Sequence, residues 1–312
     1  MRIKRSTMRS IKILTIGNSY SNDACAWLEK ILKSASYDDV IIGYINYGGC
    51  DINDHWSNVD DDITNDFGAE FFVNNNGKIQ RYPTGEDFSL VEGYKFLLSM
   101  CEWDFVIIQH GPKSVEIGET YSHLRDLLGF VKANLKSPNA KLIYHMIWKY
   151  NDNVEGGSTA QVYDDILCIT QNIMLKHKEF AGVIPAATMR QNMMSTYLTD
   201  RDISRDYGHM GLGFGRYALG LLWYSYLTGG SSDDICFIPM RDDVAPELLK
   251  RFDFDEVTEE KMIIAKEAIS NAIAHPYEIT KSKFALSDSK AVVYDELNID
   301  EHIAAVGGEH LE

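Results

Sequence analysis

The chain has 312 residues, of which 45% are hydrophobic and 24% are charged, and its formal net charge is −16. These values are typical of a soluble globular protein with one large domain or two small ones. The negative charge argues against nucleic acid and anionic membranes as partners, because both would repel the chain. No apolar run approaches the roughly 20 residues that a membrane-spanning helix needs.

The start of the chain and its cysteines bear on the compartment. The first residues are basic, but no long apolar stretch follows them, so we predict no signal peptide and a cytoplasmic protein. The cysteines are odd in number, widely spaced and without a CxxC pair, which favours neither a zinc site nor a disulfide framework. They are Cys25, Cys50, Cys101, Cys168 and Cys236.

The first elements in chain order are a strand, a turn and a helix. The strand is predicted at 11–16, and a Gly-Asn-Ser turn follows it. Apolar residues at helical spacing from Ala24 to Ala35 mark the buried face of the helix, which Ser21 or Asn22 can cap. A second strand at 40–45 ends at Gly48-Gly49. Residues 69–82 have the pattern of a β-hairpin around an Asn-Gly turn, and a helix is predicted at 89–101.

Strands and helices then alternate. The apolar run 105–108 has the length of a strand buried on both faces. The pattern predicts further strands at 141–147 and 182–184, and helices at 120–135, 158–178, 186–197, 213–228 and 258–274. Helix 213–228 is apolar on most sides, so we expect it to be buried.

This alternation predicts an α/β fold. We expect a doubly wound, flavodoxin-like parallel sheet of about five strands with helices on both faces, plus a hairpin insertion near 69–82. In such a sheet the functional site lies at the carboxyl ends of the strands. The domain is predicted to cover 11–275, and residues 276–312 form an acidic tail or appendage.

Ser19 is the first candidate for chemistry. It follows the first strand and precedes the first helix, so its hydroxyl is expected at the carboxyl edge of the sheet, near the positive end of the helix dipole. Capping of the helix by Ser19, Ser21 or Asn22 is an equally good explanation of this serine when it is taken alone.

The pair Asp206 and His209 is the second candidate. A three-residue separation lets the carboxylate hold Nδ1 of the imidazole and leaves Nε2 free as a base. Alone, this pair is better explained as a solvated turn. Together with Ser19, which would meet it at one edge of the sheet, it forms a serine–aspartate–histidine triad.

The tetrahedral intermediate of such a triad needs hydrogen-bond donors for its oxyanion. Ser19 and Gly49 could each present a backbone N–H, and Gln109 at the end of the third strand could offer its amide. A tight turn at Gly48-Gly49 and a satisfied polar group at Gln109 are the structural alternatives.

These motifs resemble a known superfamily. The segment ILTIGNSYS at 13–21 is similar to the first block of the SGNH (GDSL-like) hydrolases, and Asp206-x-x-His209 is similar to the last block, which supplies the acid and the base. Gly49 matches the second-block glycine. The set GNSYS, GGC, WDFVIIQ, YHMIW and RDYGHMG resembles a largely uncharacterised bacterial branch of the superfamily, over about residues 11–275.

The third block departs from the usual Gly-x-Asn-Asp, since Gln109-His110-Gly111 stands in its place. Sialate O-acetylesterase-like relatives also have a glutamine near this point, so the resemblance implies an oxyanion role for Gln109. Asn18, Tyr20, His110, His145 and Trp148 are possible pocket residues. Ordinary packing at a strand end explains His145 and Trp148 at least as well. Cys50 is better explained as a small buried residue than as a nucleophile.

We therefore expect a serine esterase or deacetylase that hydrolyses a small acyl ester, with Ser19, Asp206 and His209 as the catalytic residues. The similarity at Gln109 favours an O-acetyl group on a carbohydrate as substrate. No metal or organic cofactor is needed for this chemistry. A thioesterase or lipase activity, or a ligand-binding module without catalysis, stays open, as does the oligomeric state. A nucleotide-binding domain is disfavoured, because no phosphate-binding glycine motif follows Gly17.

Overall fold

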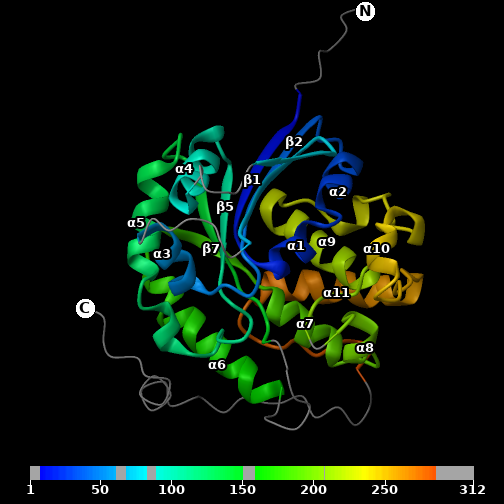
Figure 1. Ribbon diagram of the computed structural model, residues 1–312. Coiled ribbons are helices and arrows are strands. Elements are labelled where there is room, and N and C mark those ends of the chain that lie inside the picture. Colours follow the sequence, from blue (N-terminus) through cyan, green and yellow to red (C-terminus); the bar gives the residue numbers. More distant parts are fainter. Residues whose placement is uncertain (1–7, 61–67, 83–88, 150–158, 207, 286–312) are drawn as a thin grey trace, which may run out of the picture.

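The computed structural model describes residues 8–60, 68–82, 89–149, 159–206 and 208–285. One sheet runs through this part of the chain, with seven strands in the order β4-β3-β2-β1-β5-β6-β7. Helices lie on both sides of it (Figure 1). The chain is therefore an α/β protein, as predicted.

Five neighbouring strands are parallel. They are β1 (Ser10–Gly17), β2 (Asp39–Asn46), β5 (Phe105–Gln109), β6 (Lys141–His145) and β7 (Phe180–Ile184). The central strand β1 is flanked by parallel partners, β2 and β5, and its apolar residues are buried because helices cover both faces.

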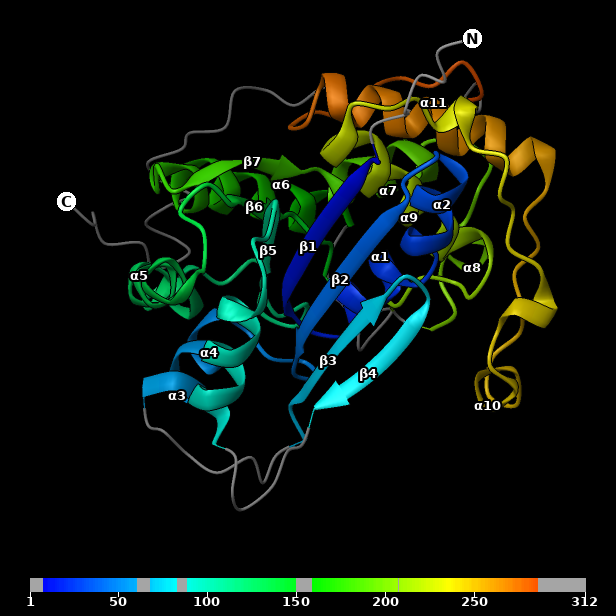
Figure 2. The same cartoon turned by 90° about the horizontal axis from the view of Figure 1, so that it is seen from above.

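The predicted hairpin joins this sheet. Strands β3 (Glu70–Asn75) and β4 (Lys78–Tyr82) meet at Asn76 and Gly77, which both have positive φ, as the tight hairpin turn requires. Strand β3 pairs antiparallel with β2, so the hairpin extends one edge of the sheet (Figure 2). The sheet is mixed and has seven strands, and the expected size of about five is not confirmed.

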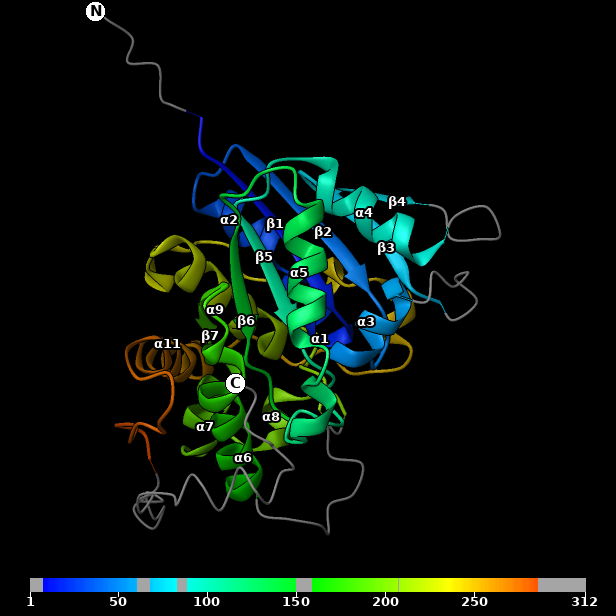
Figure 3. The same cartoon turned by 90° about the vertical axis from the view of Figure 1, so that its left-hand side faces the viewer.

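Two groups of helices cover the sheet. Helices α3 (Ile52–Asp60), α4 (Leu90–Met100) and α5 (Leu124–Asn134) contact one another and form one layer (Figure 3). On the other face, α9 (Phe214–Thr228) contacts α1 (Ser19–Cys25), α2 (Leu28–Ser34), α7 (Ala186–Met194) and α11 (Glu259–Ala274). The remaining α-helices of the described chain are α6 (Thr159–Asn172), α8 (Asp200–Ile203) and α10 (Pro246–Leu249).

The helix predicted after the first strand is divided in two. Helix α1 ends at Cys25 and α2 begins at Leu28, although the apolar spacing continues from one to the other. Trp27 lies at the break, and its indole N–H donates to the carbonyl of Leu212 at 3.1 Å. Both short helices pack against α9, which begins two residues after Leu212.

Helix α9 is buried almost throughout, as its apolar pattern predicted. Its first turn is held by Asp255, whose carboxylate accepts from the N–H of Gly213 at 2.6 Å and of Gly215 at 2.8 Å. A carboxylate in this position satisfies N–H groups that have no partner within the helix.

The predicted tail begins as a packed segment. The carbonyl of Pro276 accepts from the Thr188 hydroxyl at 2.6 Å, and the N–H of Thr280 donates to Asn192 at 2.8 Å, which ties residues 276–280 to α7. Residues 286–312 lie outside the described residues. None of the helices in the described ranges is both long and apolar enough to span a bilayer.

Candidate active site

Ser19 is the first residue of α1, directly beyond the carboxyl end of β1. Asn18 is extended and caps the helix, because its side-chain oxygen accepts from the N–H of Tyr20 at 3.1 Å. Gly17 leaves no room for a side chain, since a Cβ there would lie 2.5 Å from Oγ of Ser21. The turn therefore presents Ser19 half-buried at the edge of the sheet, which is the position that the sequence pattern predicts.

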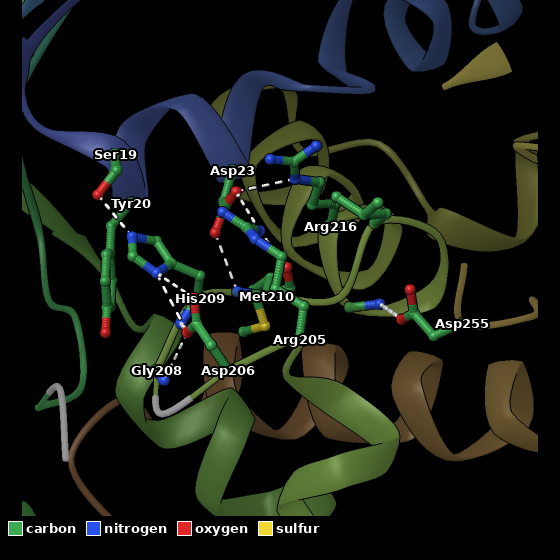
Figure 4. Close-up of polar contacts among 12 residues, drawn as sticks. Ser19, Tyr20, Asp23, Arg205, Asp206, Gly208, His209, Met210, Arg216 and Asp255 are labelled. Atoms are coloured by element: carbon green, nitrogen blue, oxygen red, sulfur yellow. Dashed lines mark hydrogen bonds and ion pairs between the residues drawn. The ribbon is translucent and has the colours of Figure 1, made fainter. Parts of the chain in front are cut away.

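Asp206 and His209 lie opposite Ser19 (Figure 4). Oγ of Ser19 is 2.7 Å from Nε2 of His209. On the far side of the ring, Nδ1 is 2.9 Å from Oδ2 and 3.1 Å from Oδ1 of Asp206. The structure thus brings together three side chains from distant parts of the sequence in one hydrogen-bonded line.

The Asp206 carboxylate determines the protonation pattern of this line. Burial raises the pKa of Asp206, but backbone hydrogen bonds from His209 and Gly208 and the charge that His209 can carry outweigh it, so the pKa lies below its usual value. An ionised carboxylate only accepts hydrogen bonds, so Nδ1 of His209 must carry the proton. Nε2 is then an acceptor for the Ser19 hydroxyl, which is the geometry of a general base.

A short loop carries the pair. We call residues 204–206 and 208–211 the base loop. The N–H of Arg205 donates to the carbonyl of His209 at 3.0 Å, and the N–H of Gly211 donates to the carbonyl of Ile203 at 2.7 Å. Ser204 and Met210 form an antiparallel bridge. These bonds close the loop on itself and leave His209 directed at Ser19.

Gln109 lies beneath the nucleophile turn and is fully buried. Its amide nitrogen donates to Oδ1 of Asn18 at 2.6 Å and to the carbonyl of His110 at 3.1 Å. Its oxygen accepts from the Ser21 hydroxyl at 2.5 Å. Both amide protons are used within the protein, so the expected oxyanion role is corrected: Gln109 holds the turn that carries Ser19.

The loop after β2 lies beside the same turn. The amide of Asn18 donates to the carbonyl of Cys50 at 3.1 Å, and the N–H of Tyr47 donates to the carbonyl of Gly17 at 3.0 Å. Gly49 is exposed and has φ of 74°, a conformation that favours glycine. Within the described ranges, the N–H groups of Ser19 and Gly49 make no hydrogen bond, which leaves two donors near Ser19 for an oxyanion.

Two of the expected pocket histidines are interior residues instead. Burial lowers the pKa of both His110 and His145 to about 3. His110 stacks on Tyr121 at 3.9 Å between ring centroids and accepts from the N–H of Ile52 through Nδ1. Nε2 of His145 accepts from the indole of Trp223 at 3.4 Å. Neither lines an open pocket, because both side chains are fully buried.

Tyr20 and Trp148 are buried aromatic residues that pack beside the hydrogen-bonded line. The ring centroid of Tyr20 is 5.3 Å from that of His209 and 4.8 Å from that of Trp148. The indole N–H of Trp148 donates to the carbonyl of Gly208 at 2.7 Å, so Trp148 supports the base loop. Of the predicted pocket residues, these two contact the site, and Asn18 is used in holding the turn.

Asp23 is a charged residue of the site that sequence reasoning missed. It lies one turn after Ser19 on α1, its carboxylate is buried, and it binds Arg205, Arg216 and the N–H of Met210 (Figure 4). The helix around Asp23 reads SYSNDAC and is largely polar, so the local pattern contains no signal that this carboxylate is buried. Its partners come from 182 and more residues away, and nothing local in the sequence reveals them.

Other chemistry has little support at this edge of the sheet. Cys50 is buried, and burial raises the pKa of its thiol well above the usual range, so its thiolate is disfavoured. The described residues include no group of three or more His, Cys, Asp or Glu side chains arranged to hold a metal ion.

Comparisons with known proteins give the family and the fold. Residues 12–245 match the family described as "Domain of unknown function (DUF4886)". The crystal structure of a DUF4886 family protein from Bacteroides uniformis ATCC 8492 is similar, with a TM-score of 0.74 and 20% sequence identity over 89% of this chain and 100% of that chain. No curated protein matches the sequence. At this level of identity the structural match concerns the fold alone.

Proposed function

Because the chain belongs to the DUF4886 family, whose description names no activity, we propose its function from the site itself: a serine esterase or deacetylase that hydrolyses small acyl esters. The observation that carries this proposal is the line from Ser19 through His209 to Asp206, with a contact of 2.7 Å on one side of the imidazole and 2.9 Å on the other. Such a line supplies both a nucleophile and its base.

The proposed reaction has two steps. His209 accepts the proton of the Ser19 hydroxyl at Nε2 while Oγ attacks the ester carbonyl carbon. The ester C–O bond then breaks, and the proton passes from Nε2 to the departing alcohol oxygen. Water, deprotonated by His209, attacks the acyl-Ser19 ester, and the acid leaves as Ser19 regains its proton. Asp206 stabilises the imidazolium in both steps.

The N–H groups of Ser19 and Gly49 are the proposed oxyanion donors. Both are near the turn that presents Oγ, and neither is used within the described residues. A preorganised donor of this kind strengthens its bond as charge develops on the carbonyl oxygen. Gln109 contributes indirectly, by fixing Asn18 and through it the orientation of Ser19.

The order of the parallel strands supports an SGNH-like assignment. Numbered along the chain, the parallel strands follow the order 2-1-3-4-5, which is the flavodoxin-like order, with the switch point between β1 and β5. Ser19 follows β1 at that switch point. The resemblance at Gln109 still favours an O-acetyl group on a carbohydrate as the first substrate class to examine.

A panel of esters tests the proposal. Acetyl, butyryl and octanoyl p-nitrophenyl esters and acetylated sugars would be assayed with the wild type and with Ser19→Ala. We expect turnover of short acyl esters, and a loss of about a millionfold in the alanine variant. Circular dichroism and thermal melting would verify that the variant is folded. Turnover that survives in Ser19→Ala, or binding of a panel member without hydrolysis by the wild type, would contradict the proposal.

A further inference from the structure

We propose that Asp23 is a positioning residue that sets the distance between Ser19 and His209, an inference that rests on the function proposed above. Asp23 would act through the base loop, to which its carboxylate is hydrogen-bonded at Arg205 and Met210. Its carboxylate is 1% exposed, and it lies four residues after Ser19 on the same short helix.

Three hydrogen bonds converge on this carboxylate (Figure 4). Oδ1 accepts from Nη1 of Arg205 and from Nε of Arg216, both at 2.8 Å. Oδ2 accepts from the backbone N–H of Met210 at 2.9 Å. All of these donors are buried or nearly so, which leaves little water to replace them if the carboxylate is lost.

The two bonds to the base loop enclose the catalytic pair. Arg205 directly precedes Asp206, and Met210 directly follows His209. Arg205 also donates to the carbonyl of Met210 through the same guanidinium nitrogen that binds Asp23. The loop is therefore closed by its own bonds and fastened to α1 at both ends of the segment that carries the base.

This attachment links the base to the nucleophile by a single helical turn. Ser19 and Asp23 move together because α1 is one rigid element, so a loop fixed to Asp23 is also fixed relative to Ser19. Arg216 lies on α9, so its bond attaches α9 to the same carboxylate. Displacement of a catalytic group by about 1 Å can cost about 100-fold in rate. A link that keeps His209 at a fixed distance from Ser19 therefore protects the rate of the proposed reaction.

Stability alone accounts poorly for this arrangement. Removing two or three charges from water is costly, and well-packed apolar residues often stabilise a protein as well as a buried ion cluster does. What apolar side chains cannot provide is a fixed orientation of the loop, because their contacts have no direction. Hydrogen bonds to one carboxylate from two sides do provide it.

The test compares Asp23→Asn with Leu98→Ala. The asparagine keeps the size of the side chain and one acceptor, but it removes the charge. We expect kcat to fall by about 100-fold while KM changes little. Leu98 is fully buried on α4, in the opposite helix layer, so its alanine variant is the control for a loss of melting temperature without a change at the site. Both would be assayed well below their melting temperatures.

A readout that needs no activity separates this inference from the proposed function. Amide hydrogen exchange at Met210 should be faster in Asp23→Asn than in Leu98→Ala at equal global stability, because the single acceptor oxygen of asparagine cannot serve both arginines and the Met210 N–H as the two carboxylate oxygens do. If the wild type hydrolyses no ester, the proposed function fails, and exchange at Met210 still decides whether Asp23 holds the base loop.

Arg205→Lys provides a second variant if Asp23→Asn does not fold. It keeps the charge near Asp23 but loses the planar guanidinium that joins Asp23 to Met210. We expect a lower kcat with an unchanged KM. The inference is overturned if the Asp23 or Arg205 variant keeps wild-type kcat, if Leu98→Ala at an equal loss of melting temperature lowers kcat as much, or if Met210 exchange is unchanged.

Discussion

Four histidines of this chain show how environment separates structural from chemical roles. Burial lowers the pKa of His55 to about 4 and of His110 and His145 to about 3, so these rings are neutral near pH 7. His209 is half-buried, and in the described part of the chain it is the histidine that contacts both a serine hydroxyl and a carboxylate. The same side chain therefore serves as a neutral interior group at three positions and as the proposed base at His209.

This difference predicts the effect of replacing His209 and His145. His209→Ala should lower ester turnover by about a millionfold, as loss of a triad base does. His145→Gln removes a ring whose bond goes to Trp223 in the interior, so turnover should stay close to that of the wild type while the melting temperature falls. Steady-state kinetics on both variants check this. Equal losses of turnover would mean that the base is wrongly assigned.

Gln109→Ala distinguishes a brace from an oxyanion donor. The substitution removes the acceptor of the Ser21 hydroxyl and one of the two donors to Oδ1 of Asn18, and a buried polar group left without a partner costs about 1–3 kcal/mol. We therefore expect the free energy of unfolding and the turnover number to fall together, which urea unfolding and kinetics on one sample would measure. A loss of about 100-fold in turnover with unchanged unfolding would instead assign Gln109 to the oxyanion.

At the scale of elements, the start of α9 depends on one acidic residue. Burial raises the pKa of Asp255, and its bonds from Gly213 and Gly215 act against this shift. Asp255→Ala should lower the free energy of unfolding by about 1–2 kcal/mol, the usual cost of losing such a cap. Denaturant unfolding measures it. Glu247→Ala, which removes an exposed ion pair with Lys250, is the control and should unfold like the wild type. Equal behaviour of the two variants would exclude the capping role.

Local patterns predicted most elements but not how they join. The five parallel strands, the hairpin and buried α9 follow from apolar periodicity and an Asn-Gly turn, which act over a few residues. The pairing of β3 with β2 and the break at Trp27 depend on contacts between distant segments. Periodicity does not encode such contacts.

The candidate site, like the fold, could be predicted from the sequence only in part. The positions of Ser19, Asp206 and His209 could be predicted because the carboxyl edge of a parallel sheet gathers strand ends. Whether Gln109 and His145 face a pocket or the interior could not, because this depends on partners such as Asn18 and Trp223. Asp23 was missed for the same reason, since its partners lie in the base loop and α9.

The whole molecule should become less stable in mild acid. The unfolded chain binds protons at His55, His110 and His145 as the pH falls below about 6.5. The folded chain does so only near pH 4 to 3, where these pKa values lie. The unfolded state thus holds more protons in this window, and the unfolding free energy falls with pH by up to about 4 kcal/mol per unit for three sites.

Two carboxyls act in the opposite direction. Burial raises the pKa of Asp51 and Asp255, so the folded state keeps protons there that the unfolded state has lost, and this reduces the slope at the acid end. Guanidinium unfolding between pH 7 and pH 5 measures the net effect. In His145→Gln the slope should be smaller by one proton, or about 1.4 kcal/mol per unit. An unfolding free energy that is flat over this range would contradict the assignment of neutral buried histidines.

Covalent labelling of Ser19 tests the central claim most directly. A fluorophosphonate reacts with a serine that a neighbouring base activates, and mass spectrometry of the digested protein identifies the modified peptide. The proposed site predicts one adduct, on Ser19, that forms quickly in the wild type and is nearly abolished in folded His209→Ala. A folded wild-type protein without an adduct, or an adduct on another serine that does not depend on His209, would contradict the assignment of Ser19 as the nucleophile.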